Sequence, residues 1–403
     1  MGLQKTSNLC LCGAQVYKDK MKTITILGST GSVGRQVLAT ISEHPDAFKV
    51  VGLSAYTNES LLREQIEKYN PTHYYFPSGA VEVQSSLFDF LEDEKTSKCL
   101  TSLEELAAIK SDIVVLAVTG IAGLWAAVAT LKRGGTLAFA NKETIVCAGR
   151  HLKALEKKYG GKILPLDTEH SAIFACLRGE EKKYVKSLVL TASGGALRDL
   201  PISQLSKVKA EDALKHPVWN MGKKVTIDSA TLFNKGLEVI EAMRLFDVKA
   251  KDVKVVMHRE SVIHSLVEFS DCGMKALLST PDMRLSIDTA LFYPEHAVNS
   301  VAPLDLIKTG MLTFSAPDFD RFPCLKIAMD AAEAGEGACI AVSACDEVLV
   351  EEFLKGKIKY NDIANTLAKV LNKFKKVGDV ELEDIIGIDE QARKYTYSMI
   401  GAK

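Results

Sequence analysis

The fold is decided by TITILGSTGSVGRQVLATISEH, residues 23–44, in which an apolar run passes through a glycine-rich turn into a helical pattern. The run at 23–27 has the β-branched composition of a buried strand. The turn Gly28 to Gly34 has the spacing GxxGxxG rather than the commoner GxGxxG. Such a turn lets the backbone approach a pyrophosphate, and the helix N-terminus offers free N–H groups. An ordinary strand-to-helix turn is the alternative, but the position after the first strand favours a nucleotide site.

The same alternation of strands and helices continues outward from this turn. Strand patterns recur at 49–56, 73–76, 112–120, 136–143 and 162–167, with helical patterns between them, the last ending near Tyr159. This alternation of strands and helices predicts a parallel sheet and a Rossmann-like α/β domain. Ligands of open α/β sheets bind at the carboxyl ends of the strands, so the end of the run KILPLD is a candidate site.

A second α/β domain follows, with strands expected at 186–193, 225–228, 254–258 and 262–269. A proline-rich stretch then predicts a long connector, and helical periodicity predicts an all-helical C-terminal domain. We therefore expect an N-terminal extension (1–20), a nucleotide-binding domain (21–166), a catalytic and dimerisation domain (167–293), a connector (294–325) and a C-terminal helical domain (326–403).

Composition limits the classes of function. Fifty basic and fifty-one acidic residues give a formal net charge of -1, so no overall field favours nucleic acid or an anionic membrane as a partner. No apolar run approaches the roughly 20 residues that span a bilayer. Nine scattered cysteines without a paired framework suit a reducing compartment. Residues 1–20 lack Arg and a long apolar stretch, so we expect a disordered extension or an added segment, with Met21 as an alternative start.

The loop after the second strand indicates the nucleotide. NAD-binding enzymes usually place an acidic residue there to bind the ribose 2′-hydroxyl. The segment LSAYTNES has no acid before Glu59, so NADP is favoured over NAD.

Two carboxylates, Asp167 and Glu169, lie in LPLDTEH. In an extended chain they would point to the same face and repel each other unless something neutralised them. The alternative is a strand end with a solvated acidic loop.

The segment 226–246 predicts one amphipathic helix that begins at Asp228 or Ser229. Its core positions are Phe233, Leu237 and Ile240, and a second face carries Asn234, Lys235 and Glu238. A solvent face with a Lys235–Glu238 ion pair is the alternative.

Two further segments add polar groups. TASGG at 191–195 places Ser193 beside two glycines, which suits a backbone-lined anion pocket, although a plain glycine turn has the same pattern. DALKHPVWNMG, which ends at Gly222, lacks periodicity and reads as a lid, with Trp219 as a core anchor in the alternative interpretation.

Together, GSTGSVG, ANKE, LPLDTEHSAIF, ASGG, HPVWNMG, IDSATLFNKGLEVIEA and ESVIHSLVEF resemble the 1-deoxy-D-xylulose 5-phosphate reductoisomerase family, in order from about Met21 to at least Phe269. The resemblance implies a divalent cation, Mg²⁺ or Mn²⁺ with Co²⁺ as a further option, held by Asp167, Glu169 and Glu238. Three oxygen ligands suit such hard cations. Lys235 joins these three as a catalytic residue, and His170 is expected to support the following helix or pack behind the ligands.

The resemblance also implies the substrate and cofactor contacts. The substrate-binding positions are Thr168, Glu169, Ser193, His216, Trp219, Met221, Ser229, Asn234, Lys235 and Glu238. The NADPH-binding positions are Gly28, Thr30, Gly31, Ser32, Val33, Ala55, Tyr56, Thr57, Asn58, Asn141, Lys142, Glu143 and Gly222.

The implied reaction rearranges 1-deoxy-D-xylulose 5-phosphate by retro-aldol cleavage and aldol rejoining, and NADPH then reduces the branched aldehyde to 2-C-methyl-D-erythritol 4-phosphate, in non-mevalonate isoprenoid biosynthesis. A homodimer in a bacterial cytoplasm is implied, with a plastid stroma as the alternative. Two other functions remain open at this point: a non-catalytic NADP-sensing protein and another NADP-dependent dehydrogenase.

Overall fold

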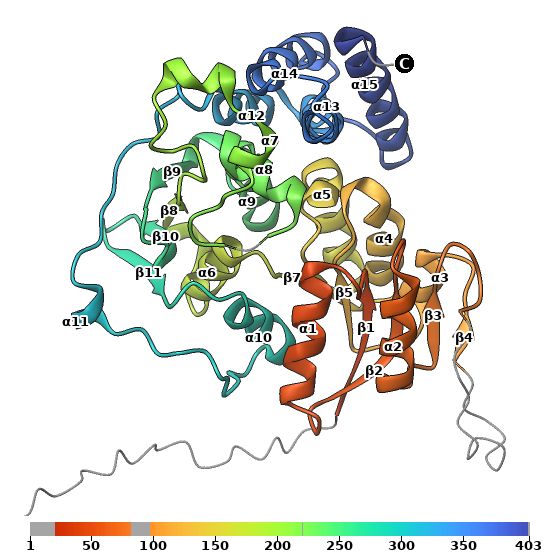
Figure 1. Cartoon of the computed structure of the whole chain (residues 1–403). Helices are drawn as coiled ribbons and strands as arrows, with labels where there is room; N and C mark the ends of the chain where they lie inside the picture. Colours follow the sequence, from red (N-terminus) through yellow and green to blue (C-terminus); the bar gives the residue numbers. More distant parts are fainter. Residues whose placement is uncertain (1–20, 82–96, 220, 402–403) are drawn as a thin grey trace, which may run out of the picture.

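The computed structural model describes residues 21–81, 97–219 and 221–401, so the expectation for residues 1–20 lies outside the described residues. Figure 1 shows three neighbouring parts: a parallel-sheet part, a part around a smaller sheet, and a helical part formed by the C-terminal segment. Within the described chain, no helix combines the length and the apolar composition needed to cross a bilayer.

The first part is a seven-stranded parallel sheet with the strand order β4-β3-β2-β1-β5-β6-β7, as expected for a Rossmann-like domain. Its strands are β1 (Lys22–Leu27), β2 (Phe48–Ser54), β3 (His73–Tyr75), β4 (Lys98–Cys99), β5 (Ile113–Leu116), β6 (Thr136–Phe139) and β7 (Lys162–Pro165). Its helices are α1 (Ser32–Glu43), α2 (Glu59–Tyr69), α3 (Leu103–Ala108), α4 (Leu124–Lys132) and α5 (Lys142–Tyr159).

Alternation along the strands explains the two helical layers of this part. Ile24 and Ile26 pack with α1, α2 and α10 (Arg284–Phe292), whereas Leu27 packs with α3, α4 and α5 on the other face. Successive side chains of a strand point to opposite faces, so one apolar run supplies both layers.

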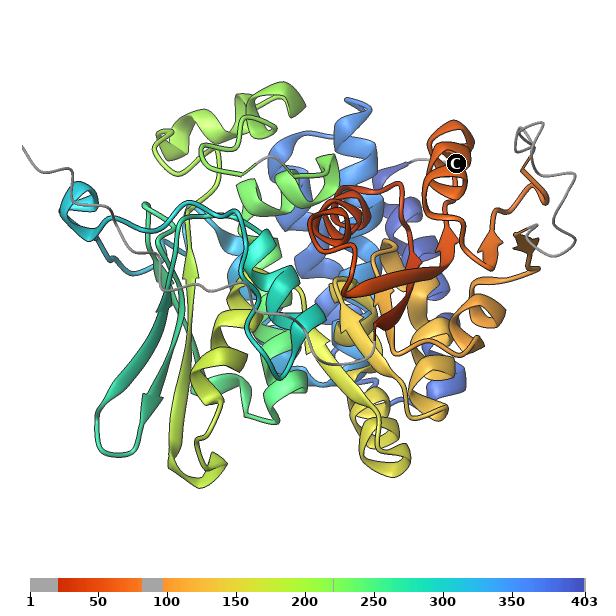
Figure 2. The same ribbon diagram turned by 90° about the horizontal axis from the view of Figure 1, so that it is seen from below.

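The second part is a four-stranded sheet with the order β11-β10-β8-β9, in which only β8 and β9 are parallel. Its elements are α6 (Thr168–Leu177), β8 (Val185–Ala192), α7 (Ala210–Ala213), α8 (Lys223–Thr231), α9 (Phe233–Phe246), β9 (Val253–Met257), β10 (Ile263–Phe269) and β11 (Met274–Leu278). In Figure 2 this sheet stands at one side of the molecule, and α6 and α9 lie between it and the large sheet. Val239 of α9 and Ile173 of α6 share a buried cluster with Leu188 and Val267 of the sheet.

Two expectations about the segment 225–246 are wrong. Residues 225–228 form part of α8 rather than a strand, and the segment is two helices that begin after Gly222 and Leu232, not one helix capped by Asp228 or Ser229. Leu232 has a left-handed backbone (φ 56°) and is buried, and Thr231 Oγ1 accepts the amide of Phe233 across the break. Tertiary packing of Leu232 thus overrides the continuous helical pattern.

The connector runs from Tyr293 past α11 (Leu306–Thr309), and the C-terminal helices are α12 (Pro323–Ala334), α13 (Glu336–Leu354), α14 (Tyr360–Phe374) and α15 (Ile385–Ile400). These helices share one hydrophobic cluster with α5 and α9, since Val146, Leu237 and Leu349 belong to it. The C-terminal helices therefore pack directly on the elements that carry the candidate site.

Candidate active site and metal centre

Three carboxylates meet between the two sheets. Asp167 caps α6, Glu169 lies in the first turn of that helix, and Glu238 lies in α9. One oxygen from each of the three lies within 4.8 Å of the others. The reason is not the strand alternation that the sequence suggested: β7 ends at Pro165, and Asp167 Oδ1 accepts the amide of Glu169 (3.1 Å) at the start of a helix.

Two lysines neutralise these carboxylates. Lys235 Nζ is 2.9 Å from Glu169 Oε1 and also contacts Glu238, and Lys142 Nζ is 3.1 Å from Asp167 Oδ2 and 3.6 Å from Glu238 Oε1. Burial opposes the charge of both lysines, but the surrounding carboxylates raise the pKa of each above its ordinary value. Both ammonium groups therefore stay charged.

Glu238 is the most enclosed of the carboxylates. Lys235 is 5% exposed and Glu238 is 1% exposed, so the solvent-face interpretation of this helix is wrong. Burial raises the pKa of Glu238 to about 7, and Asn234 Nδ2 donates to its Oε1 (2.5 Å). Phe233, Leu237 and Ile240 are fully buried, which confirms the predicted core face.

His170 lies behind the carboxylates, as expected. Its Nδ1 is 3.1 Å from Asp167 Oδ1, and its Nε2 is 3.0 Å from the carbonyl oxygen of Glu238. Burial opposes its charge, but Glu241 and Asp167 raise the pKa of His170 to about 9. An imidazolium that donates from both nitrogens orients Asp167 and offers no lone pair to a metal.

The donor set fits a hard divalent cation. Asp167, Glu169 and Glu238 offer carboxylate oxygens only, from three points of two helices, with no thiolate. Mg²⁺ and Mn²⁺ prefer oxygen ligands of this kind. Two ammonium groups already gather at the same oxygens, which shows that the cluster attracts positive charge.

Ser193 and His216 lie together beside the glycine turn after β8. The amides of Val218 and Trp219 both donate to His216 Nδ1 (3.1 and 2.9 Å). The ring must therefore carry its proton on Nε2, which lies 3.2 Å from Ser193 Oγ. Burial, together with nearby Arg198, lowers the pKa of His216 to about 4, so the imidazole is neutral.

The last turn of α8 packs against this turn. Gly195 has φ 64°, and a Cβ atom there would lie 2.5 Å from the carbonyl oxygen of Ser229. Glycine is required because the backbones touch. The glycine turn after β8 and the backbone of Ser229 are therefore in direct contact, which favours the anion-pocket interpretation of this turn.

Trp219 does not belong to any of the hydrophobic clusters found among the described residues. It is half-buried, and its ring centroid lies 6.5 Å from that of His264. Met221 is likewise half-buried. The core-anchor interpretation of Trp219 has no support in this packing, and a lid role for Trp219 and Met221 stays a prediction.

The glycine turn lies at the carboxyl end of β1. Gly28 has φ 88°, its amide donates to Ser54 Oγ (3.0 Å), and a Cβ atom on Gly34 would lie 2.3 Å from the carbonyl oxygen of Gly28. Gln65 Nε2 donates to the carbonyl of Ser29 (3.1 Å), and Ser29 Oγ donates to Gln65 Oε1 (2.6 Å). The sequence did not single out Gln65, although its place next to Ile66 on the buried face of α2 was a usable signal.

The other predicted cofactor residues lie at the ends of β2 and β6 and before α8. Tyr56 is 80% exposed, and Asn58 caps α2. Asn141 caps α5 and donates to the carbonyls of Val118 and Gly120. The structure differs most at Lys142, whose ammonium group lies in the carboxylate cluster (2.7 Å from Asn234 Oδ1). Glu143 pairs with a lysine of α8, and Gly222 precedes that helix.

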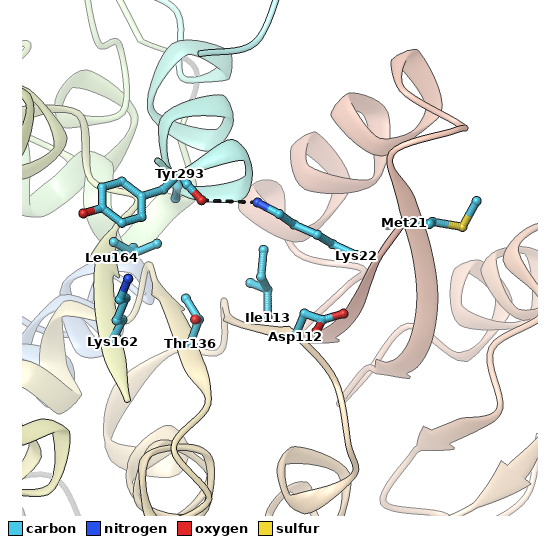
Figure 3. A pocket seen from close by; sticks show the side chains of 9 residues that line it. Met21, Lys22, Asp112, Ile113, Thr136, Lys162, Leu164 and Tyr293 are labelled. Carbon is cyan, nitrogen blue, oxygen red and sulfur yellow. Dashed lines mark hydrogen bonds between the residues drawn. The ribbon is translucent and has the colours of Figure 1, made fainter. Parts of the chain in front are cut away.

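A separate pocket lies at the opposite end of the large sheet, where β1, β5, β6 and β7 begin (Figure 3). Lys22 Nζ crosses it and donates to the carbonyls of Leu291 and Tyr293 (3.0 and 3.2 Å). None of the predicted site residues lines it. The candidate chemistry therefore stays at the carboxyl ends of the strands.

Comparison with known proteins agrees with this geometry. Three family models match: 1-deoxy-D-xylulose 5-phosphate reductoisomerase over residues 24–149, its C-terminal domain over 163–246, and the DXP reductoisomerase C-terminal domain over 278–395. The 1-deoxy-D-xylulose 5-phosphate reductoisomerase of Geobacter metallireducens is 44% identical over 384 residues, which cover 94% of this chain and 100% of the relative. That of Caldanaerobacter subterraneus is 44% identical over 379 residues, 93% of this chain and 98% of the relative.

Solved structures give the same result. A crystal structure of DOX-P reductoisomerase in complex with NADPH, fosmidomycin and magnesium superposes with a TM-score of 0.88 at 38% identity, covering 94% of this chain and 98% of that one. The enzyme from Zymomonas mobilis in complex with NADPH gives a TM-score of 0.85 at 33% identity, covering 95% of this chain and 100% of that one. The chain belongs to the 1-deoxy-D-xylulose 5-phosphate reductoisomerase family.

Proposed function

We propose that this chain converts 1-deoxy-D-xylulose 5-phosphate to 2-C-methyl-D-erythritol 4-phosphate with NADPH and a divalent cation, in non-mevalonate isoprenoid biosynthesis. The observation that carries the proposal is the convergence of Asp167, Glu169 and Glu238 next to the Ser193 and Ser229 turn, in a chain of this family. When bound, the cation polarises the carbonyl and hydroxyl oxygens of the substrate, and NADPH supplies the hydride.

The residues of this chain have separable roles in the proposal. Asp167, Glu169 and Glu238 would hold the cation, and His170 orients the first of them. Ser193, Ser229, Asn234 and Lys235 bind the phosphate, with His216 as a neutral donor to Ser193. Thr168 contributes a hydroxyl beside Glu169. Trp219 and Met221 exclude water from the substrate.

The nucleotide is proposed to lie along the carboxyl ends of β1, β2 and β6. Gly28 to Gly34 take the pyrophosphate, and the segment Ala55 to Asn58 takes the adenosine end, where no acid opposes a 2′-phosphate. Asn141, Glu143 and Gly222 complete the site. Lys142 is reassigned in this proposal to the substrate side, because its ammonium contacts Asp167 and Asn234.

A homodimer is also proposed. Exposed apolar side chains gather on the edge strand β11 and along the connector: Met274, Leu278, Leu306, Ile307, Met311 and Phe314. Ile307 is 94% exposed. An apolar edge of this kind is typical of a surface that a second copy covers. Sedimentation of wild type and of Ile307→Asp tests it, because a dimer that uses this surface weakens in the variant. The proposed setting is a bacterial cytoplasm.

The activity is tested by mixing purified protein, the pentulose phosphate, Mg²⁺ and NADPH and following the absorbance of NADPH. Consumption that requires both substrate and metal supports the proposal. NADPH consumption no faster than in a metal-free control rejects the proposal. That result would leave the non-catalytic NADP-sensing protein as the alternative function.

A further inference from the structure

A buried charged cluster beside the proposed nucleotide site joins three parts of the molecule. We name it the α8 anchor, and its residues are Glu143 of α5, Lys224 and Asp228 of α8, and Asp346 of α13. Lys224 Nζ lies 2.6 Å from Asp228, 3.0 Å from Asp346 and 3.3 Å from Glu143. Asp228 and Asp346 are fully buried.

The charges within the anchor depend on one another. Burial opposes the charge of Lys224, but Asp228, Asp346 and Glu143 raise its pKa well above the ordinary value. Burial and the neighbouring Asp228 raise the pKa of Asp346, and burial raises the pKa of Asp228. A buried group of this kind becomes costly when one partner is removed.

The C-terminal helices also hold the other end of α8. Tyr360 of α14 donates its hydroxyl to the carbonyl of Ala230 (2.9 Å), and burial raises the pKa of this phenol, which keeps its proton. Ser229 lies between the two contacts and backs onto Gly195. On the far side, Arg393 of α15 pairs with Glu347, the residue after Asp346 (2.5 Å).

We propose that the C-terminal helices α13 and α14 position the phosphate pocket by holding α8 at both ends, through Asp346 on Lys224 and through Tyr360 on Ala230. This inference rests on the proposed function for the assignment of the pocket. Asp346 and Tyr360 are positioning residues, since they act through α8 and contact neither Ser193 nor the carboxylate cluster. The C-terminal part thereby sets affinity for the phosphorylated end of the substrate.

The test compares Tyr360→Phe, Asp346→Ala and Asp346→Asn in the full-length protein. One lost buried hydrogen bond predicts a KM for the pentulose phosphate about 3-fold higher in Tyr360→Phe. Loss of the anchoring carboxyl group predicts a substrate KM about 10-fold higher in Asp346→Ala. The isosteric Asp346→Asn should bring the substrate KM most of the way back to the wild-type value. The kcat stays within about 2-fold in all three, and the KM for NADPH does so in Tyr360→Phe, whose contact with Ala230 lies at the opposite end of α8 from Gly222.

Glu352→Ala is the matched control, because Glu352 is also a buried carboxylate of α13 paired with lysines, but these lysines, Lys355 and Lys357, do not belong to α8. It leaves the substrate KM unchanged. A substrate KM that is unchanged in Tyr360→Phe and Asp346→Ala overturns the proposal, as does an equal rise in Glu352→Ala. If Asp346→Ala does not fold, Tyr360→Phe decides alone.

Calorimetry with inorganic phosphate separates this inference from the proposed function. The dissociation constant of phosphate rises in Tyr360→Phe by the same factor as the substrate KM. If the wild type fails to reduce the pentulose phosphate, the proposed function fails, while the phosphate titration still decides whether α13 and α14 position an anion pocket. Equal phosphate affinity in wild type and Tyr360→Phe overturns the positioning role.

Discussion

Replacing Glu238 with Gln tests the metal centre with little change of shape. In the wild-type cluster each of three carboxylates offers an oxygen to a cation, beside two lysines and the His170 imidazolium. Glu238→Gln replaces one of these three anionic ligands with a neutral amide. Changes to partners that only orient a ligand cost about 10- to 100-fold in metal affinity. Loss of a direct ligand therefore predicts at least about 100-fold, or about 2.7 kcal/mol.

The fold should survive this change. Gln keeps the volume of Glu238 and an oxygen that accepts from Asn234 Nδ2, as Glu238 Oε1 does, and Lys235 loses its contact with Glu238 Oε2 but keeps Glu169 as a partner. We expect the thermal midpoint of the metal-free variant to stay within about 3 °C of wild type. Kinetics at increasing Mg²⁺ then show a large loss of turnover, a higher metal requirement and an unchanged KM for NADPH.

The matched control is Glu241→Gln, which removes a buried carboxylate one turn further along α9 that contacts His170 and shares only Asp167 with the proposed ligand group. It should affect the metal requirement less than Glu238→Gln. An unchanged metal requirement and turnover in Glu238→Gln would refute the assignment of Glu238 as a ligand.

Four further predictions follow from single contacts. Lys142→Gln should raise the substrate KM or the metal requirement about 10-fold, since Lys142 contacts Asp167 and Asn234. The KM for NADPH should stay constant, and a change in that KM alone would return Lys142 to the cofactor site. Gly34→Ala must open the turn, because the new Cβ atom would lie 2.3 Å from the Gly28 carbonyl oxygen. NADPH binding should therefore weaken at least about 10-fold. The control Gly387→Ala should leave NADPH binding unchanged, because a Cβ atom there has nothing within 4 Å. His216 has a pKa lowered to about 4, so below its ordinary value of 6.5 the unfolded chain binds a proton that the folded chain refuses. Stability should therefore fall as pH drops from about 6.5 towards 4, and less steeply in His216→Asn, as urea titrations at several pH values would measure; equal slopes would contradict the neutral imidazole. Trp219→Ala should raise the substrate KM and move the thermal midpoint by less than about 3 °C, and a collapse of the midpoint would make Trp219 a core anchor after all.

The Rossmann-like part was predictable because each apolar run, turn and helical pattern there indicates the same βαβ arrangement. The three carboxylates of the candidate metal centre were also predicted, but by resemblance and not by local geometry. Asp167 and Glu169 converge through a helix cap, not through strand alternation, and the break at Leu232 that separates α8 from α9 comes from burial of a side chain in a cluster with Met257 and Leu325. Sequence periodicity carries no information about such distant packing.

Polar contacts between residues far apart in the chain could not be predicted from the sequence for the same reason. Lys142 reads as part of the ANKE cofactor motif, and only folding shows that its side chain reaches across to α9. Asp346 lies more than a hundred residues from Lys224, in a helix that is buried along most of its length. Their roles depend on which helices meet, and that is a property of the tertiary structure.

The proposed function requires this site to rearrange a carbon skeleton before it reduces the product. The direct measurement is analysis of the product by NMR and mass spectrometry after reaction of 1-deoxy-D-xylulose 5-phosphate with Mg²⁺ and NADPH deuterated at the transferred position. We expect a branched 2-C-methyl-D-erythritol 4-phosphate that carries one deuterium for each NADPH oxidised. An unbranched, directly reduced pentitol phosphate, or no product at all, would contradict it.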